Sequence, residues 1–193
     1  MVRKGNITRT ALLNTAKELF SEKGYSAVTM KDFCERNGLS RGGLYRHFAS
    51  TREIFVAMLN FDRESSSTEL DKALSNKVPA KQMFIHFINK QKQEIQNGVG
   101  RLSIAVYEFC TIETDQKDYL DKRFASAVDT LAKLIQYGQS QHEFRSCDPK
   151  ETARHIIVFL EGLKLSSAVV SFSETMIEEQ LKIIYETVVG SDK

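Results

Sequence analysis

Apolar residues recur at intervals of three and four along almost the whole chain, which is the pattern of amphipathic α-helices. No run of alternating apolar and polar residues indicates a β-strand. Pro79 and Pro149 stand where helices are expected to begin, because proline is tolerated in the first helical turn. The pattern predicts an all-α fold. Beyond residue 49 the expected helices are 50–75, 79–97, 102–114, 115–141, 149–170 and 173–189.

Two short helices separated by a tight turn are predicted near the N-terminus. Thr29 is expected to cap the first of them and Asn37-Gly38 to end it. Ser40 is expected to cap the second helix, which runs from Arg41 to His47. Two short helices joined in this way form a helix-turn-helix, a common DNA-binding geometry.

The outward face of the second helix is rich in hydrogen-bond donors and small residues, and it contains no acid that would repel phosphate. Its members are Arg41, Gly42, Gly43, Tyr45, Arg46 and His47. The charge of the chain agrees with a nucleic-acid partner here. Residues 1–52 contain ten Lys and Arg against four Asp and Glu, whereas the remainder contains 17 against 21. Positive charge is thus concentrated where phosphate would be met.

This N-terminal segment resembles the DNA-binding domain of the TetR family of transcriptional regulators, over about residues 8 to 60. The resemblance is carried by Ile7, Ala11, Ala16, Leu19-Phe20, Gly24-Tyr25, Thr29, Asn37-Gly38-Leu39-Ser40 and Leu44-Tyr45-Arg46-His47-Phe48. It implies a three-helix helix-turn-helix domain in residues 1–52, followed by a larger helical ligand-binding and dimerisation domain in residues 53–193.

The resemblance also implies which residues contact DNA. The candidates are Thr29, Ser40, Arg41, Gly42, Gly43, Tyr45, Arg46, His47, Ser50 and Thr51. Tyr45 and His47 resemble phosphate-contacting positions, whereas arginines can pair bidentately with guanine. One position departs from the family, which usually has a lysine where this chain has Thr51. A threonine hydroxyl at a helix N-terminus can still bind a phosphate oxygen, and the neighbouring Arg52 is a second candidate.

The central helices carry more large apolar side chains than a plain scaffold requires, and the resemblance implies that some of them enclose a small-molecule cavity. The candidate ligand contacts are Phe84, Phe87, Ile88, Tyr107, Cys110, Phe124, His155 and Phe159. Glu161 is a further polar residue of interest. Packing in the bundle core is the alternative role for each of these residues, since an apolar lining and an apolar core have the same composition.

The last two predicted helices carry apolar stripes that are candidates for a dimer interface. The residues are Ile156, Leu160, Gly162, Leu163, Ser167, Leu181, Ile184, Tyr185 and Val188. In the family that the chain resembles, this helix pair builds a four-helix dimer contact, and a two-fold contact suits a protein that binds a palindrome. The alternative is a core within one chain.

Several other classes of protein are not indicated. Residues 1–9 lack the apolar stretch of a signal peptide, and the longest aliphatic and aromatic run, 156–160, is too short to span a membrane. A cytoplasmic location without a membrane partner is therefore expected. The histidines are scattered, the three cysteines fit neither a metal site nor a disulfide framework, and no glycine-rich phosphate loop occurs. We expect no metal, no cofactor and no enzymatic activity.

The sequence thus predicts a homodimer that binds a palindromic operator in double-stranded DNA, acts as a repressor, and is released by a small, mainly apolar effector. Two alternatives remain open at this point. The regulator could have no small-molecule effector, or it could respond to oxidation of Cys110 or Cys147.

Overall fold

The computed structural model describes residues 9–98 and 100–190, apart from the side chain of Lys117, so Ile7 lies outside the described residues. All regular elements in the described ranges are helical, as the hydrophobic pattern predicts. They are α1 (Arg9–Lys23), α2 (Met30–Asn37), α3 (Arg41–Tyr45), α4 (Thr51–Ser75), α5 (Ala80–Gln96), α6 (Gly100–Ile112), the 3-10 helix η1 (Thr114–Gln116), α7 (Lys117–Ser140), α8 (Pro149–Ser167) and α9 (Glu174–Val188).

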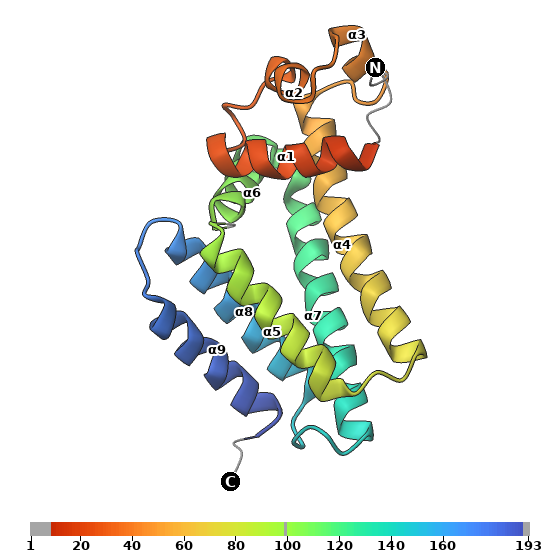
Figure 1. The fold of residues 1–193 in the computed structure, drawn as a ribbon, viewed down its shortest axis with the longest axis vertical. Coiled ribbons are helices and arrows are strands. Elements are labelled where there is room, and N and C mark those ends of the chain that lie inside the picture. Colours follow the sequence, from red (N-terminus) through yellow and green to blue (C-terminus); the bar gives the residue numbers. More distant parts are fainter. Residues whose placement is uncertain (1–8, 99, 191–193) are drawn as a thin grey trace, which may run out of the picture.

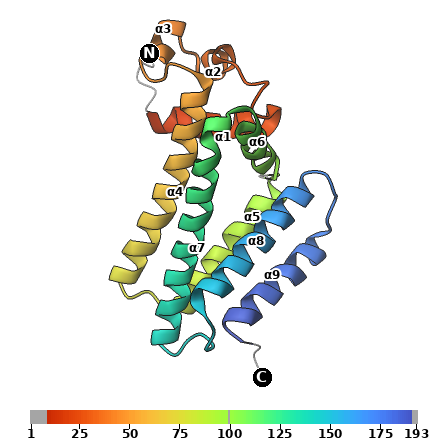
Figure 2. The same cartoon turned by 180° about the vertical axis from the view of Figure 1, so that it is seen from behind.

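The helices form two groups along the long axis of the molecule (Figure 1). Helices α1, α2 and α3 lie at one end, together with the beginning of α4. Helices α4 and α7 run away from this end, and α5, α8 and α9 complete the body (Figures 1 and 2). Helix α6 lies between the two groups and packs against both α1 and α8.

The first core cluster joins α1, α2 and α3 to the first turns of α4 and to one face of α6. Its centre is aromatic: the ring of Phe55 on α4 lies 4.6 Å from that of Phe20 on α1 and 4.9 Å from that of Phe109 on α6. The predicted domain boundary between residues 52 and 53 falls inside α4, and the packing of this cluster continues through Leu59. Helix α4 is therefore shared between the two groups.

Side-chain caps begin most helices where the sequence predicts them. The hydroxyls of Ser40, Ser50 and Ser173 accept hydrogen bonds from backbone N–H groups in the first turns of α3, α4 and α9. Three predicted helices end two or more residues early, and α6 is one of them, since it stops at Ile112 rather than at Thr114. Helix α3 stops at Tyr45, and α8 stops three residues before Val170, which is 49% exposed and has little packing to hold a further turn.

Helix α6 begins at Gly100, two residues before the predicted start, because this glycine permits a close approach to α8. A Cβ atom at Gly100 would lie 2.1 Å from the carbonyl oxygen of Lys164. The ammonium group of Lys164 also lies 2.6 Å from a carboxylate oxygen of Glu94 on α5. The start of α6 is thus fixed against α8, and α8 against α5.

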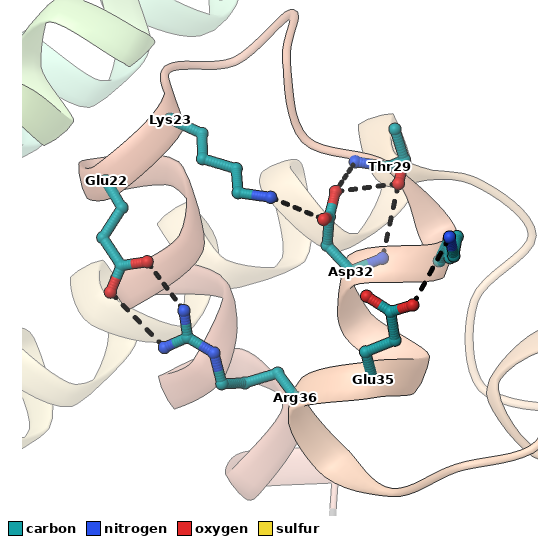
Figure 3. A network of polar contacts seen from close by, with 7 residues as sticks. Glu22, Lys23, Thr29, Asp32, Glu35 and Arg36 are labelled. Carbon is teal, nitrogen blue, oxygen red and sulfur yellow. Dashed lines mark hydrogen bonds and ion pairs between the residues drawn. The ribbon is translucent and has the colours of Figure 1, made fainter.

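The N-terminus of α2 is held by a capping box (Figure 3). The Asp32 carboxylate accepts hydrogen bonds from the backbone N–H of Thr29 at 2.7 Å and from the ammonium of Lys23 at 2.5 Å. The Thr29 hydroxyl accepts in return from the N–H of Asp32 at 3.3 Å. The hydrogen bond from Lys23, followed by those from Thr29, lowers the pKa of Asp32 from 3.8 to about 2.

Replacing Asp32 with asparagine is expected to lower the free energy of unfolding by about 0.5–2 kcal/mol at pH 7, the usual contribution of such a cap. Because the pKa is depressed in the folded state, the charged carboxylate stabilises the fold above pH 3.8, and this contribution is lost as the pH falls towards about 2. Urea unfolding of both proteins at a series of pH values measures this. A difference that stayed constant down to pH 2 would contradict the assignment.

Candidate nucleic-acid interface and internal cavity

The helix-turn-helix is held by local backbone geometry and by two apolar anchors. Gly38 adopts the left-handed conformation with φ of 63°, which ends α2 and turns the chain. Leu44 and Phe48 are 0% and 2% exposed, so they fix the inner side of α3 in the first core cluster. The opposite side of α3 therefore faces solvent.

The solvent-facing side of α3 and its C-terminal turn carries a group of free hydrogen-bond donors. Arg41, Tyr45, Arg46 and His47 are all exposed. Within residues 9–98 and 100–190, none of their side chains makes a hydrogen bond or an ion pair. Donors that have no internal partner are available to phosphate oxygens and to base edges.

The two glycines of α3 differ in their surroundings. A Cβ atom at Gly42 would meet nothing within 4 Å, whereas one at Gly43 would lie 3.3 Å from the capping hydroxyl of Ser40. Gly43 thus leaves room for the cap. Gly42 has no side chain and is exposed at the middle of α3, so another molecule can approach the backbone closely there.

Three of the four serines and threonines among the DNA-binding candidates are used as helix caps. Thr29 caps α2, Ser40 accepts from the N–H of Gly43 at 3.1 Å, and Ser50 accepts from the N–H of Glu53 at 3.2 Å. Thr51, in the first turn of α4, is half-buried. The three caps hold the N-termini of α2, α3 and α4, and a direct contact of any of these side chains with DNA stays a prediction.

Arg52, the second candidate for the missing phosphate contact, is held by acids of the body. Its guanidinium lies 2.5 Å from Asp115, and its Nε lies 3.2 Å from Glu113. The hydrogen bond to Asp115 raises the pKa of Arg52 above its ordinary value. Arg52 therefore points towards η1 in this structure, and the helix N-terminus with Thr51 is left as the candidate for that contact.

A carboxylate of α6 holds the loop between α1 and α2. Glu108 accepts hydrogen bonds from the backbone N–H of Tyr25 at 2.7 Å and from both the N–H and the hydroxyl of Ser26. The Tyr25 hydroxyl donates to Glu113 at 2.8 Å. The sequence predicts no role for Glu108, because nothing local reveals a partner 83 residues away. Movement of α6 would therefore be transmitted directly to the DNA-binding end.

The body contains a cavity of about 640 Å³ between α4, α5, α6, α7 and α8. Of the eight predicted ligand contacts, only Phe87 lines this cavity. A second core cluster joins α5, α7, α8 and α9; Phe84 is buried in it, and Ile88 and Phe159 pack against it. Cys110 packs against the first core cluster. The other predicted contacts, Tyr107, Phe124 and His155, are exposed. Periodicity finds an apolar helix face, but it does not show which faces enclose a space. Glu161, noted for its polarity, does line the cavity.

Most charged residues of the cavity wall are paired. Lys17 lies 3.1 Å from Asp62, Lys90 lies 3.9 Å from Glu69, and Lys164 lies 2.6 Å from Glu94. The unpaired charges among the described lining residues are Arg63, Arg123 and Glu161. The remaining wall is mainly apolar, as in many ligand sites.

Six of the nine predicted dimer-interface residues lie in the core of a single chain. Ile156, Leu160, Leu163, Leu181, Ile184 and Val188 are 7% exposed or less and belong to the second core cluster. Ser167 and Tyr185 are half-buried, and Gly162 is exposed. The stripes are thus occupied by intrachain packing, the alternative that the sequence left open.

The outer faces of the same two helices are apolar as well. Val158 on α8 is 57% exposed, Val169 just beyond α8 is 78% exposed, and Ile183 on α9 is 56% exposed. Exposed apolar side chains on neighbouring helix faces are typical of surfaces that another chain covers. These exposed residues, rather than the buried stripes, are the apolar side chains of α8 and α9 that a second copy could reach, and we call them the outer face.

The three cysteines are half-buried, and their surroundings differ. The Sγ of Cys147 lies 3.3 Å from the amide nitrogen of Gln139. Burial raises the pKa of the Cys110 thiol, which lowers the fraction of reactive thiolate. No cluster of three His, Cys, Asp or Glu side chains suited to a metal occurs among these residues.

These features define a helix-turn-helix DNA-binding protein with an additional all-helical domain that encloses a cavity. Residues 12–58 match the family model described as bacterial regulatory proteins, tetR family, and residues 83–178 match the tetracyclin repressor-like C-terminal domain. The chain belongs to the TetR family of transcriptional regulators. It is accordingly a transcriptional regulator and not an enzyme.

Similar proteins agree with this assignment. YfiR of Bacillus subtilis (strain 168), an uncharacterized HTH-type transcriptional regulator, is 25% identical over 189 residues, which cover 94% of this chain and 92% of YfiR. The reduced form of E. coli NemR has the same fold with a TM-score of 0.77 at 18% identity, covering 96% of this chain and all of NemR. A transcriptional regulator from Saccharomonospora viridis, crystallised in complex with choline, gives a TM-score of 0.71 at 20% identity, covering 94% and 97% of the two chains.

No helix in the described ranges is both long enough and apolar enough to cross a membrane.

Proposed function

We propose that the chain acts as a homodimeric repressor, which binds a palindromic operator through α3 and is released when a small molecule occupies the cavity. The observation that carries the DNA-binding part is the set of exposed, unpartnered donors on α3 and its C-terminal turn: Arg41, Tyr45, Arg46 and His47. A protein with this role works where chromosomal DNA lies, so a cytoplasmic location belongs to the proposal.

The cavity supports the effector part of the proposal. Its volume of about 640 Å³ suits a small organic molecule. The Saccharomonospora viridis regulator, which has the same fold, was crystallised with choline. A cavity of this kind in the present chain would accept a compound of comparable or larger size.

A continuous set of contacts links the cavity to the DNA-binding end. Leu102, Ser103 and Val106 of α6 line the cavity. Within the turn that follows Val106 on the same helix, Glu108 binds the loop between α1 and α2, and Phe109 packs in the aromatic centre of the first core cluster. A ligand that prefers a different position of α6 would change the separation of the two α3 helices in a dimer and thereby lower DNA affinity.

Replacing Arg46 with alanine is expected to weaken binding to a specific DNA duplex by about 10- to 100-fold and to relax the base preference at one position of each half-site. The duplex is selected by the wild-type protein from a random library, and affinities are measured at fixed salt. The matched control is Arg101→Ala, since Arg101 is an exposed arginine at the start of α6, away from α3. Equal losses in both variants would show that only net charge matters and would contradict the placement of α3 on DNA.

A further inference from the structure

The register of α4 against α7 can be derived from two contacts. The hydroxyl of Tyr119 on α7 lies 3.3 Å from the side-chain oxygen of Asn60 on α4. Further along both helices, the ammonium of Lys133 lies 2.6 Å from the carboxylate of Asp71. The two helices run in the same direction, away from the DNA-binding end (Figure 1). Residues one helical turn after the Tyr119–Asn60 contact therefore lie at about the same level on the two helices.

Arg63 and Arg123 are brought to the same level by this register. Arg63 follows Asn60 by one helical turn, and Arg123 follows Tyr119 by one helical turn. Both arginines line the cavity and are half-buried. Burial raises the pKa of the Tyr119 hydroxyl, while Arg123 and Arg63 both oppose this increase. Two guanidinium groups are thus near the same phenol, in the half of the cavity that lies towards the DNA-binding end.

Neither guanidinium group is neutralised by the described part of the chain. Arg63 and Arg123 make no hydrogen bond or ion pair there. The nearby carboxylate of Asp62 is bound to Lys17 at 3.1 Å. Glu161, the unpaired acid of the wall, belongs to α8 and not to the α4–α7 pair. Like charges at one level of a partly enclosed cavity repel each other, and a bound anion would remove this repulsion.

The wall of the other half of the cavity includes an apolar part, beside polar residues such as His86 and the paired Lys90 and Glu69. Leu70 and Ala73 on α4, Leu131 and Leu134 on α7, and Phe87 on α5 line it beyond the level of the arginines. A ligand that fills the whole cavity would therefore present a charged end to the arginines and a hydrocarbon body to this wall.

We propose that the effector is an amphipathic anion, whose carboxylate or phosphate group binds between Arg63 and Arg123 and whose apolar body lies along α4, α5 and α7. This inference rests on the proposed effector-controlled function and names the chemical class of the effector. The Saccharomonospora viridis regulator was crystallised with choline, which is a cation. The effector proposed for the present chain is an anion, so the two ligands would differ in charge.

Four probes of equal chain length test the proposal with the full-length protein: octanoate, octyl phosphate, octanol and octylammonium. Calorimetric titration at low salt measures their dissociation constants. We expect at least one of the two anions to bind at least about 10-fold more tightly than octanol and octylammonium, because a charge-assisted pair adds about one to two orders of magnitude in affinity. The anion with the lower dissociation constant then identifies the preferred head group as carboxylate or phosphate.

Two variants locate the binding site. Arg63→Gln and Arg123→Gln are each expected to weaken binding of the preferred anion by about 10- to 100-fold and to leave binding of octanol unchanged. Lys90→Gln is the matched control, since Lys90 is a cation of the same cavity that already has a partner, Glu69. Unchanged circular dichroism and melting temperature verify that each variant is folded.

The inference is overturned if octanol or octylammonium binds as well as the anions, if no anion binds, or if the arginine variants bind as the wild type does. The operator complex provides a separate measurement. If an anion binds through the arginines but does not release DNA, the anion site stands and effector control fails. If octanol or octylammonium releases DNA and the anions do not, effector control stands and the anion site fails.

Discussion

Replacing Phe109 with alanine is expected to lower the free energy of unfolding by about 3–5 kcal/mol. The Phe109 ring is 0% exposed, and the rings of Tyr25 and Phe55 each lie 4.9 Å from it. Its removal leaves a cavity at the point where α6 meets the DNA-binding end. Urea denaturation followed by circular dichroism measures the loss.

The control for this substitution lies on the same helix. Ile112 is 52% exposed, so Ile112→Ala is expected to change the free energy of unfolding by no more than about 0.5 kcal/mol. If Phe109→Ala cost less than about 1 kcal/mol, α6 would not be part of the first core in solution. The variant is also expected to bind DNA with less dependence on effector, because α6 would no longer hold the loop between α1 and α2 firmly.

An aspartate at Val158 or Ile183 is expected to convert the proposed dimer into monomers and to weaken operator binding by about 100-fold or more, because two linked half-site contacts become independent. Both side chains are more than half exposed within one chain, so the monomer should fold normally. Sedimentation at micromolar concentration and operator titration at fixed salt measure the two effects.

The matched control is Ile85→Asp, since Ile85 is a 45% exposed apolar residue on α5, away from the outer face of α8 and α9. It should leave both the dimer and operator affinity unchanged. Aspartate at Leu163 or Ile184 should behave differently, because these residues are 7% and 5% exposed and an uncompensated charge there would unfold the chain. A Val158→Asp protein that sediments as a dimer would place the interface elsewhere.

The local parts of the fold were predictable from the sequence because their causes are local. Thr29, Ser40, Ser50 and Ser173 each cap a helix in the structure, and Gly38 ends α2 in the left-handed conformation. Each of these features depends on one side chain and the three or four residues beside it. The helix-turn-helix and its exposed donors follow from such signals.

The interior of the body was less predictable because its causes are long-range. The stripe with Leu163 and that with Ile184 have the same pattern whether they face a second copy or the chain itself. The cavity depends on which helix faces meet, so it includes Arg63 and Arg123, which a hydrophobic pattern cannot indicate. The contact of Arg52 with Asp115 likewise joins positions 63 residues apart.

Gly100 lies against the backbone carbonyl of Lys164, so the first turn of α6 is a candidate pivot for this helix. Because the two backbones lie so close there, sliding of the first turn along α8 would meet steric resistance, whereas a rotation of α6 about that end would not. Helix α6 spans Gly100 to Ile112, and a rotation of about 5° about its first residue would move the backbone at Glu108 by roughly 1 Å, given a rise of about 1.5 Å per residue. That displacement exceeds what the hydrogen bonds of Glu108 to Tyr25 and Ser26 tolerate. A small tilt of α6 at the cavity would thereby break a contact at the DNA-binding end.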